Sequence, residues 1–173
     1  MTPSIFLFHT ALEPVAIVWF KNNKQIKIKE IVISNPKFSA EQRVAVKYPD
    51  SNFSTCGKVN QLAEKIENYC QGKNEEFDLE MFDFSQIPRF RKDVYFTLFK
   101  TKRGETLSYG ELALISGYPK AARAVGTAMK NNPFPFVIPC HRVIKSDGRL
   151  GGFFGAEEMK RKLIELESGK IIY

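Results

Sequence analysis

Residues 131–144 read NNPFPFVIPCHRVI, an apolar run that three prolines interrupt before it reaches one thiol and a neighbouring imidazole. Proline donates no backbone hydrogen bond, is excluded from helix interiors and holds the preceding residue extended. We therefore expect Cys140 on a stiff, irregular backbone rather than in a regular element. A free cysteine is more often a small buried hydrophobe. The alternative is a thiolate nucleophile activated by a nearby base.

The composition is that of a globular protein with one domain or two small ones. The chain has 173 residues, of which 43% are apolar, and its three cysteines favour a reducing compartment over a disulfide scaffold. Cys56 and Cys70 have no partner at metal-ligand spacing, so we expect neither a metal nor a cofactor. Glu13 and Pro14 interrupt the apolar N-terminus, which predicts no signal peptide and no membrane span. The expected localisation is the cytoplasm, or the nucleus in a eukaryote.

The net charge of +7 is distributed unevenly along the chain. Residues 1–86 hold 10 Lys and Arg against 11 Asp and Glu, whereas residues 87–173 hold 16 against 8. A basic excess confined to one half is expected of a polyanion-binding domain joined to a neutral one. We therefore predict two domains, 1–86 and 87–173, and favour nucleic acid over a membrane or an acidic protein as the partner of the second.

The first half has the pattern of a small α/β domain. Residues 15–20 are β-branched and aromatic, 21–24 are polar and 25–33 alternate, which predicts a hairpin. Apolar residues at spacings of three and four predict an amphipathic helix over about 58–71, and alternation over 77–81 indicates a further strand. Nothing in this half indicates chemistry.

The second half becomes helical after a junction at residues 84–88. Apolar spacing predicts a helix over about 88–101 and a last helix over about 157–168, with Gly169 as its stop. Glu167 lies near the C-terminus of that last helix, where a carboxylate opposes the helix dipole. We therefore expect Glu167 to have a partner.

A helix-turn-helix is predicted between these two helices. Ser108 and Glu111 have the spacing of a capping box, which predicts a short helix that ends at Gly117. Proline suits the first position of a second helix, from Pro119 to about Asn131. Two short helices joined by a tight turn form the motif that many DNA-binding proteins use.

Helical hairpins are also common packing units, so the charge of the second helix decides between the two interpretations. Arg123, Thr127 and Lys130 share one face that carries no acid, which favours DNA. The helix is rich in Ala and Gly. These small residues fit either close packing or a close approach to a narrow groove, and the sequence does not separate the two.

The loop at 145–156, KSDGRLGGFFGA, contains four glycines but has neither GxGxxG nor GxxxxGK[ST]. We therefore reject a phosphate-binding loop. Phe153 and Phe154 are more consistent with a loop that lines a pocket for a flat ligand.

The helix-turn-helix, the Pro-Cys-His-Arg-Val run, the glycine-rich loop and the late glutamate are together far more specific than any one of them. Residues 105–167 resemble the active-site domain of the O6-alkylguanine-DNA alkyltransferases, which are suicidal DNA-repair proteins. The matching runs are Ser108-Tyr109, PKAARAVG at 119–126, Ala128-Met129, Asn132-Pro133 and IPCHRV at 138–143. The resemblance implies a ribonuclease-H-like antiparallel sheet with a helix in the first half, and a mainly helical, winged-helix-like second domain.

The resemblance also implies catalytic roles. Cys140 would displace guanine from the alkyl group of O6-alkylguanine and keep that group irreversibly, which requires a depressed thiol pKa. His141 would act as the base through a bridging water, and Glu167 would orient the imidazole. Asn132 would tie the helix-turn-helix to the active-site segment, and Tyr109 would donate a proton or a hydrogen bond to the departing guanine.

The same family binds double-stranded DNA and flips the damaged nucleotide out of the stack. By resemblance, Arg123 would fill the vacated space and Tyr109 would crowd the phosphate, while Gly110 and Ser146 occupy further DNA-contacting positions. We expect a monomer that makes mostly backbone contacts, since lesions occur in any sequence. The sequence leaves open whether O4-alkylthymine is also a substrate.

Val143, Phe153 and Phe154 would line the substrate pocket. Many family members have Tyr followed by a small or polar residue where this chain has Phe153-Phe154. Three other classes compete with this interpretation: alkyltransferase-like proteins, which lack the acceptor thiol, helix-turn-helix regulators and cysteine hydrolases. The presence of Cys140 argues against the first class, and the Cys-His segment has no use in the second.

Overall fold

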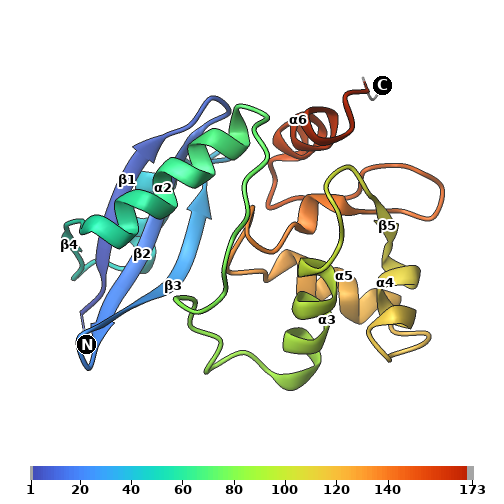
Figure 1. Ribbon diagram of the computed structural model, residues 1–173, viewed down its shortest axis with the longest axis horizontal. Coiled ribbons are helices and arrows are strands. Elements are labelled where there is room, and N and C mark those ends of the chain that lie inside the picture. The colour runs from blue at the N-terminus through green and yellow to red at the C-terminus, as the bar shows by residue number, and fades with distance from the viewer. Residues whose placement is uncertain (1, 171–173) are drawn as a thin grey trace. The chain divides into compact units, whose positions relative to one another are not determined.

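The computed structural model describes residues 2–170 (Figure 1). The chain divides into two compact units, with the boundary between Asp83 and Phe84. The division falls at the start of the segment 84–88, where the sequence indicates a junction. Along the described chain, no helix has the length and apolar character needed to cross a bilayer.

The first unit is built on a four-stranded sheet in the order β3-β2-β1-β4. Its strands are β1 (Ser4–His9), β2 (Pro14–Asn22), β3 (Gln25–Ile33) and β4 (Asn52–Phe53). The predicted hairpin is confirmed, because β2 and β3 pair antiparallel across a turn at Asn23 and Lys24, whose φ angles are 46° and 68°. The expectation of an antiparallel sheet is incomplete, since β4 pairs parallel with β1.

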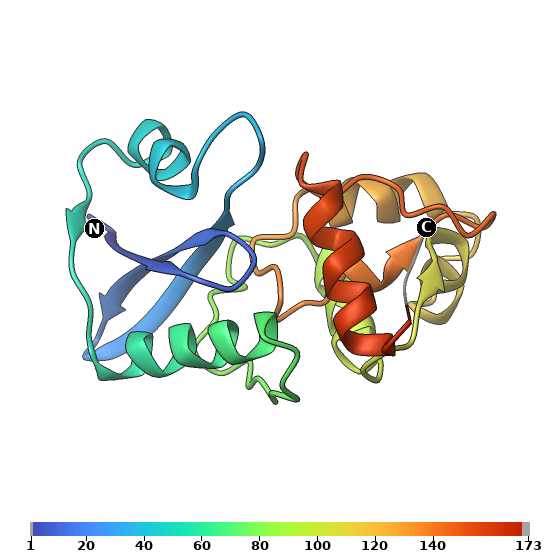
Figure 2. The same ribbon diagram turned by 90° about the horizontal axis from the view of Figure 1, so that it is seen from above.

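Two helices, α1 (Ala40–Lys47) and α2 (Gly57–Cys70), cover opposite faces of this sheet (Figure 2). The second corresponds to the amphipathic helix predicted at 58–71. Sequence reasoning missed α1, although Ser39 and Gln42 form a capping box of the kind that predicts a helix after Ser108. The core on the α1 side contains Ile5, Ala16, Val18, Val32, Ala40 and Val44.

The strand predicted at 77–81 is wrong. Residue 79 lies in a bend and residues 80–81 in a turn, and the contact with the sheet is an isolated bridge between Phe82 and Ile28. The carboxylate of Asp78 accepts a hydrogen bond from the Glu80 amide at 2.6 Å, a local contact that competes with strand pairing. The alternation over 77–81 therefore reflects partial burial of one side of an irregular segment.

Over residues 84–170, the described part of the second unit combines four α-helices with a small parallel sheet. The helices are α3 (Arg89–Phe99), α4 (Tyr109–Ile115), α5 (Ala122–Lys130) and α6 (Glu157–Ser168), and the strands are β5 (Leu107–Ser108) and β6 (Val143–Ile144). The predictions for α3 and α6 are confirmed, and Gly169 ends α6 in the left-handed conformation with φ 68°. Both units together make a mixed α/β protein with small sheets.

The helix-turn-helix consists of α4 and α5. The predicted capping box is confirmed, because Ser108 Oγ accepts from the Glu111 amide at 3.1 Å and Glu111 Oε2 accepts from the Ser108 amide at 2.7 Å. The predicted start of the second helix at Pro119 is wrong, since α5 begins at Ala122. Lys120 has φ 70°, a left-handed conformation that continues the turn and is incompatible with a helix.

Candidate active site

Cys140 opens a single 3₁₀ turn, Cys140–Arg142, directly after Pro139. We expected Cys140 on an irregular backbone, and this is wrong, because the residue begins a short 3₁₀ helix. The proline-containing segment before it does lie outside regular structure. The Cys140 amide donates to the Ile138 carbonyl at 2.7 Å, and the chain continues from the turn into β6. The thiol thus lies between the end of α5 and the small sheet.

The Asn132 side chain holds this segment in place from the end of α5. Its Nδ2 donates to the Ile138 carbonyl at 2.9 Å and to Cys140 Sγ at 3.1 Å, and its Oδ1 accepts from the Phe134 amide at 3.0 Å. Asn132 is 3% exposed, so these groups have little access to water as an alternative partner. One buried amide therefore fixes both the backbone and the sulfur.

Burial raises the pKa of the Cys140 thiol to about 11. The Asn132 amide, the nearby Lys160 ammonium and the backbone amides of Cys140 and His141 all favour the thiolate, but they do not compensate for the lost hydration. The expectation of a depressed pKa is therefore wrong for the protein by itself. The surrounding donors would nonetheless stabilise negative charge that develops on the sulfur during a reaction.

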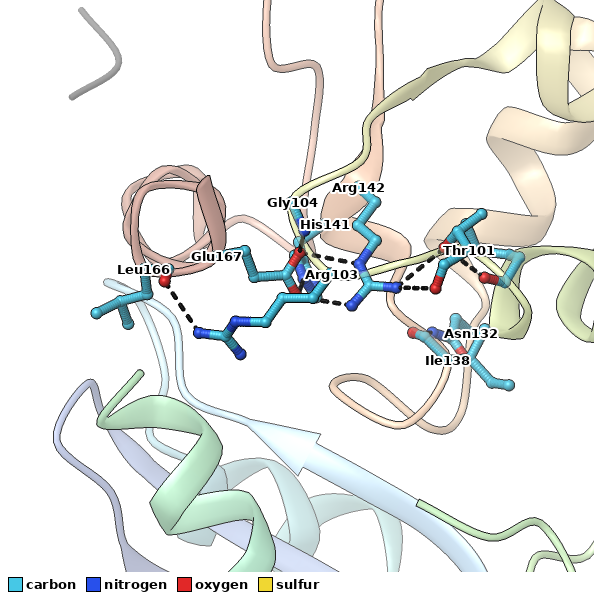
Figure 3. A network of polar contacts seen from close by, with 10 residues as sticks. Thr101, Arg103, Gly104, Asn132, Ile138, His141, Arg142, Leu166 and Glu167 are labelled. Carbon is cyan, nitrogen blue, oxygen red and sulfur yellow. Dashed lines mark hydrogen bonds and ion pairs between the residues drawn. The ribbon is translucent and has the colours of Figure 1, made fainter. Parts of the chain in front are cut away.

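Glu167, on the last turn of α6, is the centre of a buried polar network (Figure 3). Its Oε1 lies 3.0 Å from His141 Nε2, and its carboxylate accepts two bonds of 2.9 Å from Arg142 Nε and Nη2. The Gly104 amide adds a fourth contact to Oε2 at 3.1 Å. The expectation that Glu167 has a partner is confirmed, and the partners explain why a carboxylate is tolerated at a helix C-terminus.

His141 is fully buried in this network. Burial lowers the pKa of its imidazole, while the hydrogen bond with Glu167 acts in the opposite sense. Because the Glu167 carboxylate forms an ion pair with Arg142, we expect His141 Nε2–H to donate to it, which leaves Nδ1 as the basic nitrogen of a neutral ring.

Sequence reasoning missed two cations, Arg142 and Lys160. Arg142 also donates to the Thr101 carbonyl at 2.6 Å, so it joins the turn after α3 to α6. Two signals in the sequence could have indicated Arg142. It directly follows Cys140 and His141, and Glu167 was expected to need a partner. Lys160 gives no comparable signal, since its position on the buried side of α6 depends on packing.

The Lys160 side chain is completely buried, and its Nζ donates to the Val143 carbonyl at 2.6 Å. Burial lowers its pKa to about 8, although Cys140 and Glu157 favour its charged form. Val143 was expected in the substrate pocket. Its side chain is fully buried and is not among the residues that line the cavity beside Cys140.

Cys140 lines a cavity of about 360 Å³, within the range of small-molecule sites. Phe153 and Phe154 form part of the wall and contact each other edge to face, with ring centroids 5.1 Å apart. Phe154 has φ 54°, an uncommon conformation for a bulky residue. The full lining is Tyr109, Gly126, Met129, Lys130, Cys140, Gly152, Phe153, Phe154, Gly155 and Glu157.

A second depression, of about 460 Å³, shares Tyr109 and Gly126 with this cavity and therefore adjoins it. It brings together all four residues that the resemblance assigns to DNA, namely Tyr109, Gly110, Arg123 and Ser146. Its remaining lining residues are Ser108, Ala122, Gly126, Lys145 and Asp147. The glycine at position 126 lets the Tyr109 ring lie against α5, 3.9 Å from where a β-carbon would be.

Residues 89–169 match the family described as 6-O-methylguanine DNA methyltransferase, DNA binding domain. The chain is also 35% identical over 153 residues to a methylated-DNA–protein-cysteine methyltransferase of Methanosarcina barkeri, and this match covers 88% of the chain and 83% of the relative. The chain belongs to the methylated-DNA–protein-cysteine methyltransferase family.

Other methyltransferases extend this likeness. The one from Methanothermobacter thermautotrophicus is 38% identical over 109 residues, which are 63% of this chain and 61% of that protein. A crystal structure of Mycobacterium tuberculosis O6-methylguanine methyltransferase covers 98% of the chain and 95% of its own, with 28% identity and a TM-score of 0.77. Another, of Mycobacterium tuberculosis OGT in complex with DNA, covers 97% and 94%, with 27% identity and a TM-score of 0.73. The methyltransferase fold therefore includes the first half, where sequence patterns matched the family only in outline.

Proposed function

We propose that this protein repairs O6-alkylguanine in duplex DNA by transferring the alkyl group irreversibly to Cys140, once per molecule. The observation that carries the proposal is that the Cys140 thiol lines a cavity adjoining a depression that holds Arg123. A thiol in a base-sized cavity next to a basic surface suits an alkylated base presented from DNA. The family membership and the DNA complex of a relative support the same assignment.

In the proposed reaction the sulfur attacks the alkyl carbon, an S–C bond forms and the C–O6 bond breaks. The thiol proton leaves toward His141, and guanine receives a proton in its place, so the product is a thioether plus ordinary guanine. Because the resting thiol has a pKa of about 11, we infer that proton removal accompanies the attack rather than preceding it. Asn132 and Lys160 would stabilise the developing thiolate, and Glu167 would hold the imidazole.

A base stacked in a duplex has no access to Cys140, so the proposal requires the nucleotide to be flipped out. Arg123 is exposed on the first turn of α5 and would fill the vacated stack. Tyr109 borders both hollows, so it would contact the backbone and reach the departing guanine. Gly110 and Ser146 would contact phosphates.

Phe153 and Phe154 of the pocket loop would influence which alkyl groups the protein accepts. Phe153 has no phenol hydroxyl and Phe154 has no polar side chain, so the backbone amide of Phe154 would donate to guanine O6. Replacing Phe154 by Ser should change the ratio of rates with O6-benzyl- and O6-methylguanine, measured as single-turnover transfer. An unchanged ratio would remove the idea.

Several finer assignments belong to the same proposal. They are a ribonuclease-H-like first unit, a winged-helix-like second unit, a monomer on DNA, activity on O4-alkylthymine and a cytoplasmic or nuclear location. The mixed sheet flanked by helices supports the first, and the β6 strand with its following loop beside α5 supports the second.

The test is to incubate the protein with duplex DNA that contains O6-methylguanine and to measure the mass of the intact protein. We expect a gain of one methylene group per molecule, mapped to the peptide containing Cys140, and no gain in Cys140→Ala. Buried Cys70 serves as the internal control. Binding without a mass change would favour a regulator or an alkyltransferase-like protein, and repeated turnover would favour a hydrolase.

A further inference from the structure

The loop after β6 contributes charged groups to the depression that holds Arg123. It is closed by hydrogen bonds from the Lys145 amide to the Arg149 carbonyl at 2.8 Å and from the Gly148 amide to the Lys145 carbonyl at 3.0 Å. Gly148 has φ 83°, which favours glycine at this turn. As a result Lys145, Ser146 and Asp147 line the depression, whereas Arg149 is outside its lining.

Asp147, the acidic residue that lines this depression, is neutralised by Arg149 of the same loop. Arg149 Nε and Nη2 donate to Asp147 Oδ2 at 2.8 and 2.6 Å, and the Arg149 amide donates to Oδ1 at 3.1 Å. These bonds lower the pKa of Asp147 to about 2, so the carboxylate remains charged and paired at neutral pH. An exposed pair of this kind contributes little to stability.

Lys145 is the cation of the loop that forms no close ion pair. It is exposed, and within residues 2–170 its ammonium lies in ion-pair distance of no carboxylate, although its charge also helps to lower the pKa of Asp147. The depression therefore presents Lys145 and Arg123 as two positive charges, with Asp147 screened by Arg149. Phosphate binding by such cations releases counterions and makes affinity depend on salt.

We propose that Lys145 is a second phosphate-binding cation beside Arg123, and that Arg149 is a positioning residue that keeps Asp147 from repelling the DNA backbone. The inference rests on the proposed function, because it assumes that DNA occupies the depression. The two members of the ion pair should therefore differ: loss of Arg149 weakens DNA binding, whereas loss of Asp147 does not.

The experiment measures binding of the full chain to an undamaged duplex by fluorescence anisotropy over a range of salt concentrations. K145Q should reduce the slope of log affinity against log salt by about 0.9 and weaken binding about eightfold at 0.1 M salt. R149Q should weaken binding as well, and the double variant R149Q/D147N should restore it. K58Q removes an exposed lysine of the first unit and serves as the charge-matched control.

Each outcome decides between the ideas. A K145Q variant that behaves like K58Q would overturn the phosphate contact, and R149Q that D147N does not rescue would overturn the positioning role. Circular dichroism of every variant verifies the fold. If the unmodified protein neither binds duplex DNA nor takes up an alkyl group, the proposed function itself fails, which distinguishes that failure from the failure of this inference.

Discussion

Two charged regions of the second unit contain the same residue types in very different surroundings. Around Glu167, whose side chain is 3% exposed, buried Arg142 and His141 share one carboxylate. Around Asp147, 48% exposed, Arg149 pairs with the carboxylate in contact with solvent. Burial makes the first network costly to break and fixes its geometry, whereas exposure to solvent makes the second pair weak.

The largest expected effect comes from breaking the buried network with Glu167→Gln. Removing one partner of a buried ion pair leaves Arg142 uncompensated and should lower the free energy of unfolding by about 3–5 kcal/mol, measured by urea denaturation. Single-turnover alkyl transfer should also slow. The control on the same helix is Glu158→Gln, since Glu158 is 62% exposed and lies 3.6 Å from Arg161. Equal losses in both variants would contradict the contrast between the two regions.

The second prediction concerns Lys160, whose folded-state pKa of about 8 lies below the ordinary value of 10.5. Between these values the unfolded chain binds more protons than the folded one, so the stability of the protein should increase as pH rises. The gain should be about 3 kcal/mol from pH 8 to pH 10.5 relative to Lys160→Met. Lys162→Met, at an exposed position of the same helix, should show no such difference. Parallel pH profiles for the original protein and Lys160→Met would refute the buried-cation interpretation.

The third prediction separates two neighbouring asparagines. Asn132→Ala leaves the Ile138 carbonyl and the Phe134 amide without their buried partner, which should cost about 1–3 kcal/mol and slow alkyl transfer. Asn131→Ala removes an exposed bond to the Thr127 carbonyl and should change stability by about 0.5 kcal/mol or less. Thermal denaturation and single-turnover rates measure both. A larger effect at Asn131 would be evidence against the bridging role of Asn132.

The smallest expected effect concerns Tyr109, which borders both the cavity beside Cys140 and the depression that contains Arg123 and Asp147. Gly151 and Gly117 have φ 71° and 85°, so alanine at either should cost about 1–2 kcal/mol of conformational energy. Only at Gly151 would the new β-carbon lie 2.7 Å from Tyr109 Oη, whereas nothing lies within 4 Å at Gly117. Gly151→Ala should therefore slow alkyl transfer more than Gly117→Ala at similar stability. Equal rates would mean that the position of Tyr109 is not critical.

Local patterns predicted those elements whose signals lie within a few residues of one another. The capping box at Ser108 and Glu111, the hairpin turn at Asn23 and the stop at Gly169 are of this kind. The strand expected at 77–81 was wrong because alternation does not ensure a neighbouring strand. The helix start expected at Pro119 was wrong because a proline that suits the first position of a helix suits a turn equally well.

By itself, the sequence determined which residue types are available for the chemistry, and its resemblance to the alkyltransferases assigned roles to Cys140, His141, Asn132 and Glu167. Only the tertiary structure decided the burial that raises the pKa of Cys140, the sharing of Glu167 by Arg142, and the approach of Lys160 to the sulfur. These properties depend on distances between segments far apart in sequence and on the exclusion of water. The spacing of residues along a chain predicts neither these distances nor the exclusion of water, since both arise only when helices and loops pack.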